Sequence, residues 1–175
     1  GQYGQLYNQT TEEMGWHYAG AAHAEGDFGR WNLKTEVIGF EYAPAQVEGE
    51  EDFVLMGAYD APYQVAKKGQ LYIGGLSYRL PIDWGPVESL TFYNDFTFFD
   101  KQNEFYTDSR MNVAGVMIQA GNVYAYLDAA SGESHPWIGP AWSEALSRGR
   151  GDNATVAEPG NDWATRFNLN LGYYF

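Results

Sequence analysis

Seven charged side chains are the first candidates for chemistry in this sequence, because they lie on the polar parity of segments that alternate between polar and apolar residues. They are Lys34, Glu36, Arg79, Asp95, Arg110, Asp128 and Arg166. In a wide barrel these side chains would line a water-filled channel and bias which ions pass. In a narrow barrel of eight strands, whose interior only just accommodates side chains, they would pair into a closed ionic core. The residues leave both interpretations open.

The sequence gives little support for metal binding, catalysis or nucleic-acid binding. His17 and His23 share one face of a predicted strand but lie about 20 Å apart, so they cannot bind one metal ion, and we expect neither a metal nor a cofactor. The sequence has no cysteine, which excludes thiolate metal sites and disulfides. It has no Gly-rich phosphate loop and no nucleophile elbow, so we do not expect an enzyme. With 23 acids against 10 bases and a net charge of −13, the chain is a poor candidate for binding nucleic acid.

The C-terminal segment shows what kind of element positions these residues. From Trp163 to Phe175 the sequence alternates with a period of two, which is typical of a β-strand with one apolar face. At about 3.3 Å per residue and a tilt near 45°, this length crosses the hydrocarbon core of a bilayer. We predict that its apolar parity faces lipid, with aromatic residues near both ends: Trp163, Phe167, Leu169, Leu171, Tyr173 and Phe175.

Seven further segments are predicted as strands, with boundaries good to about 2–4 residues. They are about 15–24, 31–43, 53–61, 70–81, 87–99, 107–119 and 121–130. The strongest helical signal is a turn or two near 141–147, and the longest apolar runs are far shorter than the roughly 20 residues of a membrane-spanning helix. We therefore predict an all-β chain, an antiparallel transmembrane β-barrel of about eight strands that forms one domain over 1–175.

The connections between these segments alternate in length. The loop at about 131–162 is long, the next connection back, Ala120-Gly121-Asn122, is tight, and the alternation continues towards the N-terminus. Outer-membrane barrels have short periplasmic turns and longer extracellular loops, so we predict that 131–162 is extracellular. One connection disagrees, because Pro44–Asp52 should be a short periplasmic turn but spans about nine residues.

Several segments resemble one known family. Leu90–Asp95, Asp108–Val113, Tyr124–Asp128, Ser131–Trp137 and Arg166–Phe175 are similar to the last strands of porins of the phosphate-selective O/P-like family. This resemblance covers roughly the last 90 residues. It implies a bacterial outer-membrane location, sixteen strands, a homotrimer and anion selection by basic channel residues, for which Lys34, Arg79, Arg110 and Arg166 are available. The terminal Phe175 also resembles the assembly signal of outer-membrane barrels.

Two chain organisations follow from the resemblance. The chain is either the C-terminal half of a sixteen-stranded porin or a complete barrel of eight strands whose end resembles that porin. It starts with Gly1-Gln2-Tyr3 and shows no leader, so we expect a processed chain or a part of a longer one. A half-barrel would have to pair with its missing half or with another chain, because open sheet edges are not tolerated in lipid.

The function expected from these observations is passive diffusion of small hydrophilic solutes or ions, anions included, through an outer-membrane porin. Its partners would be membrane lipid, lipopolysaccharide and the permeating solute. One alternative is a small closed outer-membrane barrel with a structural or adhesion role. A second is a soluble β-sandwich that binds carbohydrate through exposed aromatic residues such as Trp137 and Trp142.

Overall fold

Eight strands form one antiparallel sheet in the computed structural model, in the order β1-β2-β3-β6-β7-β8-β9-β10. The structure describes residues 1–9, 11–45, 53–58, 61–103, 106–135, 138 and 163–175. The sheet strands are β1 Gln2–Asn8, β2 Glu13–Phe28, β3 Trp31–Ala43, β6 Lys68–Trp84, β7 Val87–Asp100, β8 Ser109–Ala120, β9 Val123–Glu133 and β10 Ala164–Tyr173. The predicted all-β chain with an antiparallel sheet of eight strands is confirmed.

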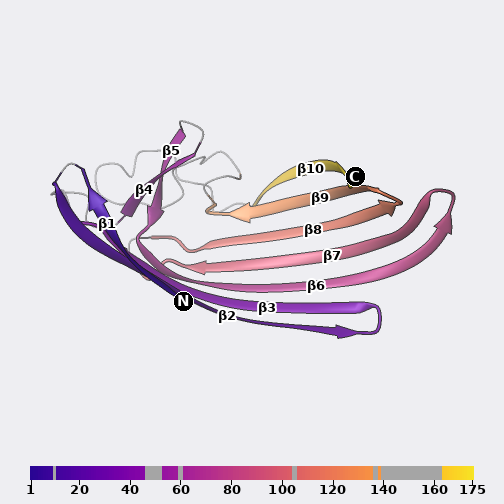
Figure 1. The fold of residues 1–175 in the computed structure, drawn as a ribbon, viewed down its shortest axis with the longest axis horizontal. Helices are drawn as coiled ribbons and strands as arrows, with labels where there is room; N and C mark the ends of the chain where they lie inside the picture. Colours follow the sequence, from indigo (N-terminus) through magenta and orange to yellow (C-terminus); the bar gives the residue numbers. More distant parts are fainter. Residues whose placement is uncertain (10, 46–52, 59–60, 104–105, 136–137, 139–162) are drawn as a thin grey trace.

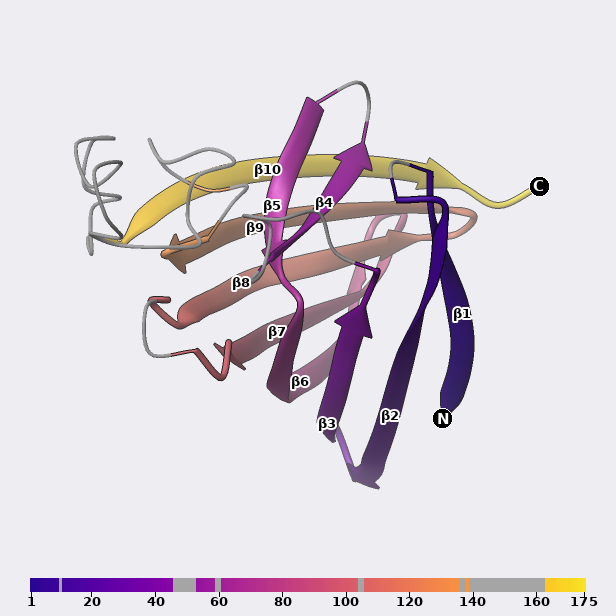
Figure 2. The same ribbon diagram turned by 90° about the vertical axis from the view of Figure 1, so that its left-hand side faces the viewer.

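The sheet is curved but open (Figures 1 and 2). Each strand pairs only with its neighbours in the order, so β1 and β10 are edge strands that do not pair with each other. The closed barrel of eight strands is therefore not formed within this chain. The β1 edge is also short, because Gln2–Asn8 pairs only with Glu13–Ala19 and leaves the rest of β2 at the edge.

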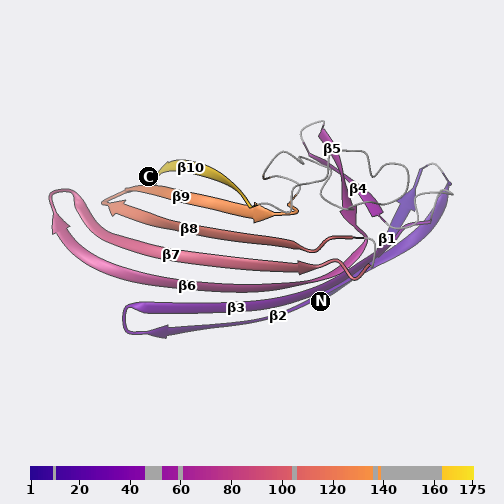
Figure 3. The same cartoon turned by 180° about the vertical axis from the view of Figure 1, so that it is seen from behind.

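The two ends of the sheet differ, as seen from behind in Figure 3. At one end, which we call the turn end, two-residue turns join β2 to β3, β6 to β7 and β8 to β9. The first residues of these turns, Gly29, Gly85 and Gly121, all have positive φ. This is the glycine position of type II′ hairpin turns. At the other end, which we call the loop end, the connections are longer. The predicted alternation of short and long connections is confirmed at the tight turn that the sequence analysis located at Gly121.

A separate hairpin at the loop end corrects one predicted strand. Phe53–Ala58 (β4) pairs with Ala61–Ala66 (β5) and not with the eight-stranded sheet, so the prediction of 53–61 as a barrel strand is wrong. The whole segment from Pro44 to Lys67 is one connection between β3 and β6, which explains why the region after Pro44 was too long for a turn. The sheet still has eight strands because β1, which the sequence analysis did not predict, adds a strand at the edge beside β2.

The pairing register defines two faces of the sheet. The outer face carries the apolar parity, including Trp31, Leu76, Phe92 and Leu169, and the inner face carries the opposite parity. A Cβ added at the outer-face residues Gly39 or Gly74 would meet nothing within 4 Å. Side chains on the inner face fold across its glycines instead, so the inner face is crowded and the outer face is open.

The described residues have almost no interior of their own. The small buried cluster consists of Ala66 and Tyr106 with Phe53 and Phe99 packed against it, at the loop end. Most of the large apolar side chains of the sheet are exposed on the outer face. None of the described residues forms a helix long and apolar enough to cross a membrane.

Candidate functional site on the inner face

The register brings six of the seven predicted channel residues onto the inner face. In one row across the sheet, Lys34 pairs with Gly75, Gly75 with Asp95, and the row continues through Val113 and Ala130 to Arg166. Rows on either side of it hold the other three, Glu36, Arg79 and Asp128. That these residues line a pore stays a prediction.

Arg110 is the exception, and its placement on the polar parity is wrong. It pairs with Phe98, whose other neighbour is Tyr72, so all three lie on the outer face. Its guanidinium lies 3.2 Å from Glu133 and 5.9 Å from the centre of the Phe98 ring. The error arose because β8 carries apolar residues on both faces, and its alternation therefore does not reveal which parity is polar.

A hydrogen-bonded chain on the inner face joins side chains from three strands, β7, β9 and β10, and passes over β8. The Tyr93 hydroxyl donates to Asp128 Oδ2 at 3.0 Å, and the Asn168 amide donates to Asp128 Oδ1 at 2.7 Å. Gly115 lies between Tyr93 and Asp128 in the register, and a Cβ there would be 2.6 Å from the Tyr93 oxygen. The glycine is therefore what allows Tyr93 to reach across β8 and fix the Asp128 carboxylate.

A second glycine makes room for charge one row away. A Cβ at Gly75 would lie 2.5 Å from an Asp95 carboxylate oxygen, so Asp95 leans over β6 towards the side of Lys34. The Lys34 ammonium makes its ion pair on its other side, with Glu25 at 3.4 Å, and both of these side chains are exposed. An exposed pair of this kind contributes only about 0–1 kcal/mol to stability.

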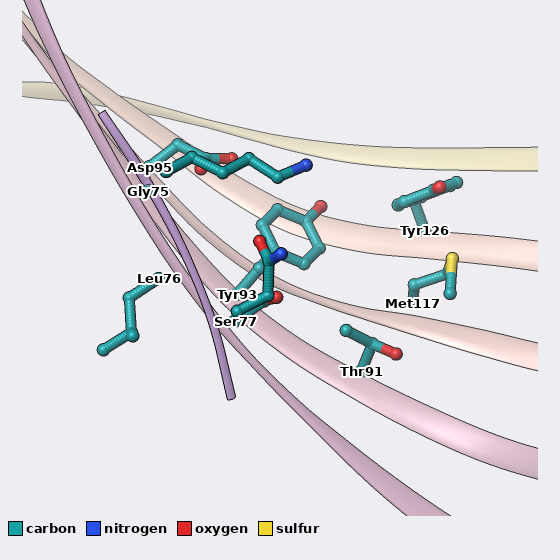
Figure 4. Close-up of a pocket in the computed structure, with 10 residues that line it drawn as sticks. Gly75, Leu76, Ser77, Thr91, Tyr93, Asp95, Met117 and Tyr126 are labelled. Atoms are coloured by element: carbon teal, nitrogen blue, oxygen red, sulfur yellow. The ribbon is translucent and has the colours of Figure 1, made fainter. Parts of the chain in front are cut away.

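These residues border a groove of about 330 Å³ on the inner face, shown in Figure 4. Its walls combine polar and apolar side chains and come from five strands, β3 and β6 to β9. Tyr93 and Asp95 on β7 stand beside Ser77 on β6, and Met117 and Tyr126 complete the wall on β8 and β9 (Figure 4). A groove with hydroxyls, an ammonium and a carboxylate can hold water or hydrated ions, and it shows no arrangement of nucleophile and base.

The loop end holds a buried charge. Lys101 is only 4% exposed, and its ammonium donates to the Thr107 carbonyl oxygen at 2.5 Å. Burial lowers the pKa of Lys101 to about 8, and the nearby Asp108 carboxylate opposes this shift. Burial also lowers the pKa of His135, with a smaller contribution from the charge of Lys101. The connections after β7 and β9 are thus electrostatically coupled.

The outer face is exposed and free of charge over its middle. On β10, Phe167, Leu169 and Leu171 are 82%, 62% and 72% exposed and, with Tyr173, share this face. Trp163 and Phe175 are also exposed and lie just outside the strand. Aromatic residues gather towards both ends of this face: Trp16, Tyr18, Tyr72 and Phe98 nearer the loops, and Phe28 and Trp31 nearer the turns.

Charged residues return at the margins of the outer face. Two ion pairs, Glu41 with Lys68 at 4.0 Å and Arg110 with Glu133 at 3.2 Å, lie at the loop end of the strands. Within the apolar middle, Asn94 and Asn112 hydrogen-bond each other reciprocally at 3.0 Å. The amides of this pair therefore satisfy part of each other's hydrogen-bonding capacity without water.

The sequence analysis predicted most of the charged residues of the inner face but not the hydrogen-bond partners of Asp128. Tyr93 and Asn168 lie on the expected parity, but their contact with Asp128 depends on the register of β7, β8 and β9, which periodicity does not supply. The one available signal was Gly115 itself, because a glycine inside a predicted strand marks close approach of a neighbour. Trp137, Trp142, the turn near 141–147 and most of the 131–162 loop lie outside the described residues.

Comparisons with known proteins do not identify a family. No protein-family model matches the chain, and no curated protein or solved structure matches it. Within the part of the chain that the structure describes, no group of three or more His, Asp or Glu side chains could hold a metal ion.

Proposed function

We propose that the chain is part of the wall of an outer-membrane porin, through which small hydrophilic solutes and ions diffuse passively. The observation that carries this proposal is the two-sided sheet. One face is an exposed apolar band with no charge in its middle, and the other is a polar face with a groove. A water-soluble sheet would bury such an apolar face against a second layer. Lipid is the environment in which an exposed apolar band is stable.

The asymmetry of the two ends supports the same proposal. Tight glycine turns at one end and longer connections at the other are the pattern of outer-membrane barrels, with the turns in the periplasm. The proposal places the protein in the bacterial outer membrane, with lipid and lipopolysaccharide against the outer face. The ion pairs at the loop end would then lie near the lipopolysaccharide headgroups.

The open edges require further strands. An unpaired row of backbone groups in lipid costs several kcal/mol per group, so β1 and β10 must each acquire a neighbour. β1 runs towards the loop end and β10 runs away from it, so the two edges are antiparallel. An even number of added up-and-down strands would therefore close the barrel. Eight more, the number that the resemblance implies, would give a lumen wide enough for water.

The first experiment compares the native protein on SDS gels with and without boiling. A folded membrane barrel resists SDS until heated, so the unboiled sample should migrate differently from the boiled one. The boiled band reports whether the polypeptide matches the 19.6 kDa of this sequence or is about twice as large. A chain that needs no detergent and shows no heat-dependent shift would overturn the proposal in favour of a soluble β-sandwich.

Conductance then tests the channel itself. Purified native protein added to a planar lipid bilayer should give stepwise current increases of uniform size. A heat-shifted barrel that produces no steps would indicate the alternative, a closed barrel with a structural or adhesion role.

A further inference from the structure

The charges on the two faces of the sheet lie in different places. On the outer face they lie only at the margins, where Glu41 pairs with Lys68, Arg110 pairs with Glu133, and Glu88 and Asp100 lie near the two ends of β7. By the pairing register, six acidic side chains lie on the inner face, two of them near the ends of β2. The basic side chains on that face are three: Lys34, Arg79 and Arg166. The inner face therefore carries an excess of negative charge.

The contacts of the inner acids preserve this excess where the groove lies. Lys34 is matched by Glu25 at 3.4 Å, so this pair contributes no net charge. Asp128 is held by the Tyr93 hydroxyl and the Asn168 amide, which are neutral donors that stabilise the carboxylate without cancelling it. Asp95 lines the groove, and no ion pair joins it to a cation in the described part of the chain.

We propose that the channel prefers cations, so that small hydrated cations and cationic solutes cross more readily than anions of equal size. This inference rests on the proposed function, because the inner-face charges act on permeating ions only if that face lines a water-filled pore. A lumen lined with one sign of charge concentrates ions of the opposite sign. The residues that matter most are Asp95 and Asp128, which lie well inside β7 and β9, away from the strand ends.

The inference differs from what the family resemblance implies. Anion selection would require basic residues to dominate the lumen, but Arg110 lies on the outer face and Lys34 is paired with an acid. Arg79 and Arg166, the other two of the four basic residues, lie on the inner face, where they are outnumbered by the acids.

The experiment measures reversal potentials of the native protein in a planar bilayer under a tenfold KCl gradient. We expect a permeability ratio of potassium to chloride above one. Asp95→Asn and Asp128→Asn should each lower the ratio about two- to threefold, because a unit charge about 7 Å from the ion path acts on potassium and chloride in opposite directions and salt near 0.1 M screens about half of each effect. Both substitutions preserve side-chain shape and exchange one carboxylate oxygen for an NH2 group, which at position 128 can donate to the Tyr93 hydroxyl while the remaining oxygen accepts from Asn168. Arg79→Gln should raise the ratio by a similar factor.

The matched control is Glu88→Gln, which removes the same charge from an exposed outer-face position at the turn end of β7. It should leave the ratio unchanged. A further check is ionic strength, because in 1 M salt the screening length falls to about 3 Å and the preference should shrink. A heat-dependent gel shift verifies that each variant is folded.

The outcomes separate the two proposals. Conducting channels with a ratio at or below one would overturn the cation preference and leave the porin proposal in place. A ratio above one that Asp95→Asn and Asp128→Asn leave unchanged would also overturn it, because other charges would then set the preference. A folded protein without conductance would overturn the proposed function and the cation preference together.

Discussion

The two faces of the same strands place different demands on their side chains. On β7, Phe92 and Phe96 on the outer face are exposed, while Tyr93 and Asp95 on the inner face border a groove and reach across to neighbouring strands. The outer face needs only side chains of the right polarity, because nothing in the described part of the chain packs against it. The inner face needs particular side chains at particular places, because its residues contact one another. One strand can thus tolerate change on one side and resist it on the other.

The largest expected contrast between the faces comes from placing charge on β10. Leu169→Arg should cost about 2–4 kcal/mol of folding free energy if the residue lies near the bilayer midplane. Asn168→Arg, on the inner face one residue away, should cost much less, because the new charge lies near Asp128 and water. Urea titration of folding into lipid vesicles measures both. Equal costs would show that the faces or the environment have been assigned incorrectly.

Replacing one glycine on each face with alanine tests whether the inner face is more crowded than the outer face. Gly115→Ala places a Cβ 2.6 Å from the Tyr93 oxygen and 2.7 Å from the Asp128 Cβ, so we expect a loss of about 1–3 kcal/mol. Gly74→Ala, on the outer face, meets nothing within 4 Å and should change stability by less than about 0.5 kcal/mol. The same unfolding titration compares them. A tolerated Gly115→Ala would mean that Tyr93 and Asp128 move apart easily.

The loop end differs from both faces because it contains a buried charged side chain, Lys101, whose effect on stability depends on pH. The folded chain releases the Lys101 proton at a pKa of about 8, and the unfolded chain does so near 10.5. Between these values the unfolded state binds more protons, so stability should rise with pH, by about 1 kcal/mol from pH 7 to 9. Unfolding titrations at several pH values measure this rise. In Lys101→Met it should disappear, and a variant that keeps the full rise would assign it to another group.

The smallest contrast concerns one hydroxyl on the inner face. Tyr93→Phe removes the hydrogen bond to Asp128 and should cost about 1 kcal/mol, because the carboxylate keeps its bond from Asn168. Tyr126→Phe is the matched control, since that ring packs at 6.2 Å against Tyr93 and donates no described hydrogen bond to Asp128. If both variants lose the same stability, the hydrogen bond to Asp128 contributes nothing specific.

Sequence periodicity predicted the faces well where the alternation was strong. The apolar parity of β10 and the polar parity that includes Lys34, Asp95 and Asp128 follow directly from residues two apart, because successive side chains of a strand point to opposite sides. The tight turns were also predictable, since Gly121 supplies the positive φ that a two-residue hairpin needs.

What periodicity does not contain is which strand pairs with which. Phe53–Ala58 alternates like any strand, yet its hydrogen bonds go to Ala61–Ala66 and not to the sheet. Gln2–Asn8 is short and mixed in character, and it becomes a strand only because β2 offers an edge. Arg110 was assigned to the wrong face for a related reason, since both parities of β8 are apolar. Register, and with it the network around Asp128, is a long-range property.

The β4–β5 hairpin makes the connection between β3 and β6 a natural place to alter the protein. The two sheet strands pair up to Glu41 and Lys68, and the Tyr42 amide donates to the Lys67 carbonyl oxygen at 2.6 Å directly beside them. The ladder is therefore complete without the hairpin, which behaves as an insertion between two strands already in register. Shortening this segment, or replacing it with a foreign peptide, should leave the sheet intact.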